Sequence, residues 1–262
     1  MDSFLLLSIP LALLFWVRWF FKFKTNGVTP PQRLVRIGLG IVVPLLCGIF
    51  LLAVLAQMSS SDVRSDPEIV VQYWALGLVW IGATQWAFAF LGVSTRDDVI
   101  ERRNPAAAIV SAGQLIAATC CFAGANIGDG PGIEVVLFCA ALSTFSLVLL
   151  WVVFDRIAWI GDTITIERNL FAGIRGAGWL VATGIVLGGG IAGDWSSASR
   201  TLVEFGAYAW PAAALTAAAA FLELRLRKSP SNGWTNQFPV SAAIAIGYVA
   251  LAILYVYKRG LF

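Results

Sequence analysis

Histidine is absent from the 262 residues, and acidic and basic side chains together make up only 13% of them. Without histidine the chain lacks a usual haem and metal ligand and the commonest proton shuttle. Its cysteines, Cys47, Cys120, Cys121 and Cys139, form no CxxC pair and all fall in apolar stretches. We therefore expect no disulfide, no zinc site and no other metal or cofactor.

Apolar residues dominate instead, at 59% of the chain, which excludes an ordinary soluble domain. The fold class that this composition predicts is an all-α, polytopic membrane bundle of about eight transmembrane helices. Pro211 is expected to break the start of the seventh of them. The eight stretches long enough to cross a bilayer lie near residues 3–21, 33–57, 70–92, 105–127, 134–154, 170–192, 203–222 and 239–257.

One stretch of the chain occurs twice. Residues 97–129 align without a gap to residues 162–194 after a shift of 65 positions, with identical Asp, Arg, Asn and Gly residues at matching places. An ungapped internal match of this length indicates a duplication. It predicts four segments: an N-terminal hairpin and outer loop, two copies of a two-helix unit, and a C-terminal hairpin, at 1–69, 70–131, 132–195 and 196–262.

Each copy contains a membrane-spanning helix with its own end signals. Asn104 and Asn169 are good N-cap residues, and Gly128 and Gly193 fit the left-handed position that closes many helices. The 23 residues between Asn and Gly in each copy span about 35 Å as a helix, enough for a hydrocarbon core. We expect capping, rather than ligand binding, to explain these four residues.

The two copies start on helices separated by an even number of spans, so they are predicted to run in the same direction as a parallel repeat. Arg103 and Arg168 then lie beside two helix N-termini, where they are expected to contact lipid headgroups or, alternatively, a specific anion. At the other end, Asp129 and Asp194 are candidates for carboxylates at the outer mouth of a path.

Polar residues within the spans are the remaining candidate sites. Gln85 and Gln114 are predicted either to pair between helices or to line a cavity, and Arg175 either to snorkel to the headgroups or to face a cavity or carboxylate. The sixth span is glycine-rich, and its GxxxG spacings predict close helix packing around Gly184, Gly188 and Gly189.

The distribution of basic residues predicts the orientation. Of 18 Lys and Arg residues, 14 belong to the odd-numbered loops and their flanks. The positive-inside rule therefore places these loops and both Asn caps in the cytoplasm, and both termini outside.

The segments DDVIERRNPAAAIVSAG and ERNLFAGIRGAG resemble a bacterial inner-membrane family, domain of unknown function 350 (UPF0719-type), over about residues 70–194. Members of that family are four-span units with an acidic loop, an Asn and an Ala-rich helix start. The residue before Asn is commonly Gly in the family, whereas this chain has Arg103 and Arg168. The resemblance implies the inner membrane and an association with membrane-stress and envelope systems, but no reaction.

Two functions fit these features. A scaffold or accessory subunit is favoured by small loops and a glycine-rich packing helix, and an ion channel or small-solute transporter along the repeat axis is the alternative. We do not expect an enzyme, because no catalytic constellation is present. Membrane lipids and other membrane proteins or further copies of the chain are the expected partners. Nucleic acid is not, since the net charge of +3 is explained by topology.

Overall fold

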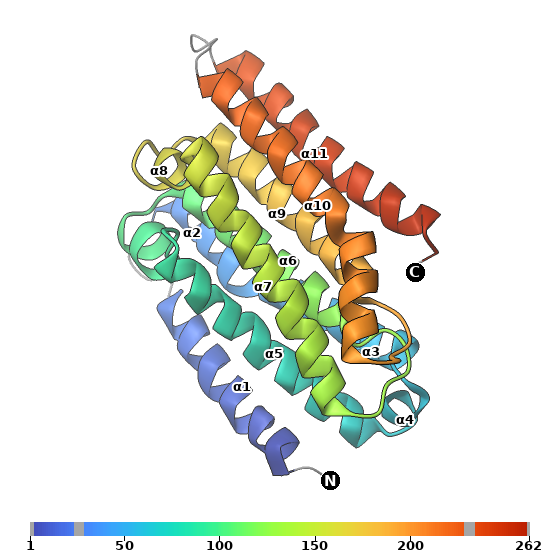
Figure 1. Cartoon of the computed structure of the whole chain (residues 1–262). Coiled ribbons are helices and arrows are strands. Elements are labelled where there is room, and N and C mark those ends of the chain that lie inside the picture. The colour runs from blue at the N-terminus through green and yellow to red at the C-terminus, as the bar shows by residue number, and fades with distance from the viewer. Residues whose placement is uncertain (1–2, 24–28, 228–233, 261–262) are drawn as a thin grey trace.

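The structure is a computed structural model that describes residues 3–23, 29–227 and 234–260 (Figure 1). Within these ranges the chain forms eleven α-helices and two π-helical segments. Their bounds are α1 Ser3–Lys22, α2 Pro30–Ile37, η1 Gly38–Val42, α3 Val43–Met58, α4 Ser61–Arg64, α5 Pro67–Phe90, η2 Thr95–Glu101, α6 Pro105–Gly124, α7 Ile133–Ala158, α8 Ile160–Thr165, α9 Leu170–Ile191, α10 Ala198–Arg227 and α11 Trp234–Lys258.

The helices confirm a multi-pass membrane protein. Six of the described helices are long and apolar enough to span a bilayer, or seven if α5 and η2, which are bent by 80° at their junction, form one broken span. The first predicted span, at 3–21, corresponds to α1 and lies outside that set, so the structure supports six or seven spans rather than the predicted eight. Helix α1 packs along α5, where the Trp16 indole donates to the Leu78 carbonyl.

Proline does not break the seventh span as predicted. Pro211 lies inside α10, which runs unbroken from Ala198 to Arg227. A proline removes one helical hydrogen bond, but neighbouring groups in a membrane bundle can satisfy the freed carbonyl, so the helix continues.

The centre of the bundle is the pair α6 and α9, most of whose residues are buried. Near the start of both helices Gly173 of α9 faces Ala106 of α6, and further along both of them Gly184 faces Ala117. The two helices therefore run parallel. Helices α3 and α5 pack against α6, α10 and α11 pack against α9, and α7 lies across both central helices and against α10, with α1 outermost beside α5 (Figure 1).

The bundle therefore has two distinct ends. We call the end that carries Asn104 and Asn169 the cap end, and the end that carries Gly128 and Gly193 the glycine end. Because α1 runs with α5 and α11 runs with α9, α1 begins and α11 ends at the glycine end. The terminal residues themselves, 1–2 and 261–262, which the sequence predicts to lie outside, are not among the described residues.

Candidate functional site

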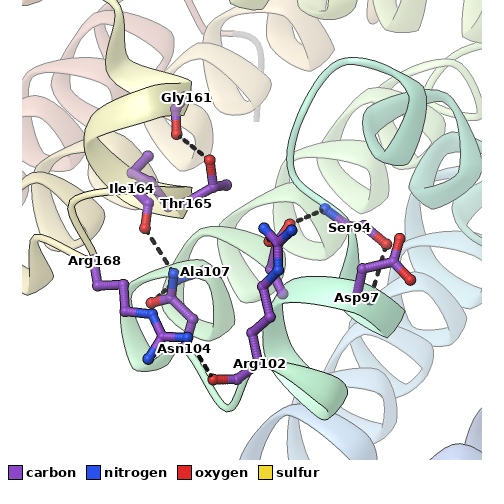
Figure 2. A network of polar contacts seen from close by, with 10 residues as sticks. Ser94, Asp97, Arg102, Asn104, Ala107, Gly161, Ile164, Thr165 and Arg168 are labelled. Carbon is purple, nitrogen blue, oxygen red and sulfur yellow. Dashed lines mark hydrogen bonds and ion pairs between the residues drawn. The ribbon is translucent and has the colours of Figure 1, made fainter.

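The N-termini of the central helices α6 and α9 lie at the cap end, and part of the polar network there is shown in Figure 2. The Asn104 side-chain oxygen accepts hydrogen bonds from the backbone N–H groups two and three residues ahead, at 3.0 and 3.3 Å. Asn169 does the same at 3.0 and 3.1 Å. Both residues thus occupy N-caps, satisfying N–H groups that the first turn of each helix leaves unpaired.

Hydrogen bonds also join the segments that lead into α6 and α9. The Asn104 amide donates to the Ile164 carbonyl at 2.7 Å, and the Arg168 guanidinium donates to the Arg102 carbonyl at 3.0 Å (Figure 2). Arg103 and Arg168 both have φ of +54°, a left-handed conformation that glycine adopts at little cost. That conformation explains why glycine suits the position before Asn. Both arginines are exposed, as contact with headgroups or an anion requires.

Between the caps and the glycine end, α6 and α9 meet through their backbones. Gly184 faces Ala117, Gly188 faces the Cys120 carbonyl, and a Cβ atom added at Gly124 would overlap the Gly188 backbone. Such contact is what GxxxG-type spacings permit. Gly189 points the other way, towards Val256 on α11. The three predicted packing glycines thus lie at two different helix interfaces of α9.

Arg175 lies buried between three helices. Its guanidinium forms a two-point ion pair with Glu223 of α10, with one N–O distance of 2.6 Å, and donates to the Ser241 hydroxyl of α11 at 2.8 Å. The side chains of Arg175 and Glu223 are each only 8% exposed. Of the two predicted settings, pairing with a carboxylate is therefore the one observed. A bidentate geometry of this kind stabilises the charges and fixes the helices in register.

Sequence reasoning missed Glu223. The predicted seventh span ended at residue 222, which left this carboxylate in the following loop. The helix face was nonetheless visible in the sequence, because Ala212, Thr216, Ala219 and Glu223 follow one another at spacings of three and four residues and all are buried. An acidic residue at the end of a helix face of small residues could have been predicted to form an ion pair with a basic residue in a neighbouring span.

Gln85 and Gln114 are also buried, but neither amide has a hydrogen-bond partner among the described residues. Helices α5 and α6 run antiparallel with Gly77 against Phe122. Counting eight residues along each helix from that contact reaches Gln85 and Gln114, so the two amides lie at the same level of the bundle. They are not brought together with Arg175, which pairs elsewhere.

At the glycine end, α6 stops before the predicted residue 127, whereas α9 ends close to the predicted residue 192. Helix α6 ends at Gly124 and α9 at Ile191, so Gly128 and Gly193 lie in the following loops with φ of +106° and +133°. The Asn126 amide donates to the Phe122 carbonyl at 2.7 Å and occupies an acceptor that a longer helix would use. Gly128 therefore shapes a loop beyond the helix end, whereas Gly193 directly follows Ala192, the C-cap residue of α9, as predicted.

The loops at the glycine end form a hydrogen-bonded ladder. The Gly128 N–H donates to the Met58 carbonyl at 3.3 Å, and the Gly193 N–H to the Ile127 carbonyl at 3.0 Å. The Trp195 N–H donates to the Asp129 carbonyl at 2.8 Å. In addition, the Asp194 carboxylate accepts from the Asp129 backbone N–H at 2.9 Å. Three segments distant in sequence are thus held in fixed register.

This ladder forms one wall of a cleft of about 380 Å³ between the ends of α3, α5, α7, α9 and α10. Asp129 and Asp194, the predicted outer-mouth carboxylates, both line it. Asp62 and Glu204 add two further acidic side chains, and the described lining residues include no Lys or Arg. No group of three His, Cys, Asp or Glu residues is arranged to hold a metal ion anywhere in the described ranges.

Comparison with known proteins gives one match. No curated protein and no solved structure matches the chain significantly. A protein family described as Domain of Unknown Function (DUF350) matches residues 40–167, which run from the second span through α8. This confirms the resemblance, although the matched segment starts before residue 70 and ends just before Asn169 rather than near residue 194. The chain therefore carries a DUF350 family domain, over residues 40–167.

Proposed function

We propose that this membrane protein is a scaffold or accessory subunit of a bacterial inner-membrane assembly, with no reaction and no conduction of its own. The observation that carries this proposal is the backbone contact between α6 and α9. Gly173 against Ala106, Gly184 against Ala117 and Gly124 against Gly188 close the seam near its start, middle and end. A path along the repeat axis would have to separate these helices.

We further propose that residues 70–131 and 132–195 are two copies of one unit. Each consists of a long helix, a short bent segment and an Asn-capped helix. The Asn104 N–H donates to the Asp98 carbonyl and the Asn169 N–H to the Thr163 carbonyl, at 2.9 and 3.0 Å, and these pairs are related by the same shift of 65 positions. Helices α5 and α7 run parallel as well, since Trp80 bonds to Thr144 and Phe88 packs on Trp151.

Rigid packing suits a scaffold for a physical reason. Two parallel helices joined backbone to backbone, cross-linked at their caps and fixed by a ladder at their far ends, have little freedom to move apart. The outward helices present apolar side chains such as Phe145, Leu202 and Leu251, which are more than half or about half exposed and suit lipids, partner helices or another copy. Envelope-stress assemblies, suggested by the family resemblance, are the first place to look for such partners.

A channel or small-solute transporter is the second candidate, and one observation favours it. The buried amides of Gln85 and Gln114 lack partners, and an unpaired amide in an apolar interior costs roughly 1–3 kcal/mol. Water or a polar solute moving past this level of the bundle would satisfy both amides.

Planar-bilayer recordings on the purified full chain separate the two candidates. The scaffold proposal expects no unitary currents over a range of salts and voltages, and crosslinking in native membranes that captures a stoichiometric membrane partner or a second copy. Wild-type currents that change in a Gln114→Leu variant would overturn it in favour of the path. A matched Gln57→Leu variant, changed at an exposed position of α3 near the glycine end, should leave any currents unaltered.

A further inference from the structure

The cleft at the glycine end has the chemistry of a binding site. Its acidic side chains, Asp62, Asp129, Asp194 and Glu204, come from four separate segments of the chain. Glu204 is partly neutralised by an ion pair with Arg200 at 2.7 Å, but the other three have no basic partner within 4.0 Å among the described residues. The cleft is therefore complementary to positive charge.

A buried polar group in the cleft independently indicates a ligand. Gln72 of α5 lines the cleft, its residue is only 4% exposed, and its side-chain oxygen has no hydrogen-bond partner in the described part of the chain. Buried acceptors in native proteins are normally paired. A donor entering the cleft would pair with this oxygen, since an amide oxygen accepts hydrogen bonds only.

Aromatic rings complete the lining. Tyr73, Trp195 and Tyr208 all contribute to the cleft. The guanidinium of Arg259 already lies over the Tyr208 ring, 5.2 Å from its centroid, so one ring here makes a cation–π contact within the protein. Rings of this kind attract organic cations through the negative potential of their faces.

We propose that this cleft binds a small organic ammonium cation. The N–H or N–CH groups of such a ligand meet the Gln72 oxygen and the carboxylates, and its alkyl part meets the rings. A metal ion fits less well, because hard cations need several convergent oxygen ligands and no three acidic side chains converge in the described residues. The hydrogen-bonded ladder fixes one wall in advance, which lowers the entropy cost of binding. The site does not depend on whether the protein is a scaffold or a transporter.

The test uses the purified full chain in lipid nanodiscs, with choline and butylammonium as probes. Calorimetric titration should give saturable binding of at least one probe, and the thermal unfolding midpoint should rise with its concentration. Gln72→Leu and Asp129→Asn should each weaken binding by about tenfold or more, equivalent to about 1.4 kcal/mol. Glu68→Gln makes the same charge change at the same end outside the cleft, and should alter binding less than about twofold.

Gln72→Leu distinguishes ligand recognition from a structural role. Replacing an unpaired buried amide by an apolar side chain of similar size should leave the ligand-free protein at least as stable as the wild type. A less stable ligand-free variant would instead assign Gln72 to the packing of α5. The proposal is overturned if neither ammonium probe binds, if Gln72→Leu binds as the wild type does, or if Ca²⁺ alone raises the unfolding midpoint.

Discussion

Arg175 and Glu223 hold opposite charges at a depth where the surrounding side chains are apolar. Their residues are 7% and 6% exposed, and the Ser241 hydroxyl oxygen accepts a hydrogen bond from the guanidinium. Moving such charges out of water is costly, so the pair persists only because each charge is matched by the other and by hydrogen bonds. The same geometry joins α9 to α10 and α11, and all three helices follow the DUF350 domain, which ends at residue 167.

Removing one partner should therefore destabilise the fold more than removing both. Arg175→Leu leaves the Glu223 carboxylate buried and unpaired, and should lower the free energy of unfolding by about 3–5 kcal/mol. An Arg175→Leu/Glu223→Leu double variant should recover most of that loss, because apolar side chains can replace a buried pair at little cost. Thermal unfolding in nanodiscs measures both variants.

The exposed pair Arg96–Glu101, with side chains 72% and 58% exposed, supplies the control. Its Glu101→Gln variant should unfold at nearly the wild-type temperature, because exposed ion pairs contribute little. A double variant as unstable as Arg175→Leu would mean that packing around the guanidinium, rather than its charge, holds these helices together.

Residue identity alone predicted some of these features and not others. The Asn caps follow local rules, since the side chain bonds to N–H groups only two and three residues away. The partner of Arg175 is 48 residues away, and no local rule selects it. Likewise, the sequence shows that Gln85 and Gln114 lie deep in their spans, but only the packed bundle reveals that their amides are unpaired.

At the scale of elements, length and apolarity located the six or seven helices that could span a bilayer, but the predicted span at 3–21 lies outside that set. What composition did not reveal is how each span ends or bends. The 80° bend between α5 and η2 follows a loop with Gly92 at φ +102°, and α6 stops at Gly124 although apolar residues continue. Both features depend on side-chain and loop hydrogen bonds outside the helix itself.

The seam between α6 and α9 gives the prediction at this scale. Gly124→Ala places a methyl group in the Gly188 backbone, which cannot move aside as a flexible side chain could. We expect a loss of about 1–3 kcal/mol in the free energy of unfolding. Gly206→Ala in α10 is the control, because its Cβ would meet nothing within 4 Å and alanine favours a helix by up to about 1 kcal/mol. Equal unfolding midpoints for the two variants would contradict backbone contact along the seam.

At the scale of the whole molecule, the arrangement of the helices relates the two chain ends to the cleft. The start of α1 and the end of α11 lie at the glycine end, together with the cleft. Basic residues, by contrast, concentrate in the odd-numbered loops, which lie towards the cap end. If the positive-inside rule holds, the cap end faces the cytoplasm and the cleft opens to the outside, where an external ligand would reach it.

Two single-cysteine variants test this orientation. Ser196→Cys lies exposed at the glycine end and Glu101→Cys exposed at the cap end, whereas the four native cysteines are buried or partly buried and serve as the background. With a membrane-impermeant maleimide on intact cells, Ser196→Cys should be labelled and Glu101→Cys should be labelled only after the membrane is opened. The reverse pattern would place the cleft in the cytoplasm and confine its ligand to cytoplasmic cations. Labelling of both variants in intact cells would mean that the two ends are not separated by the bilayer, and the bundle could then not span it along its long axis.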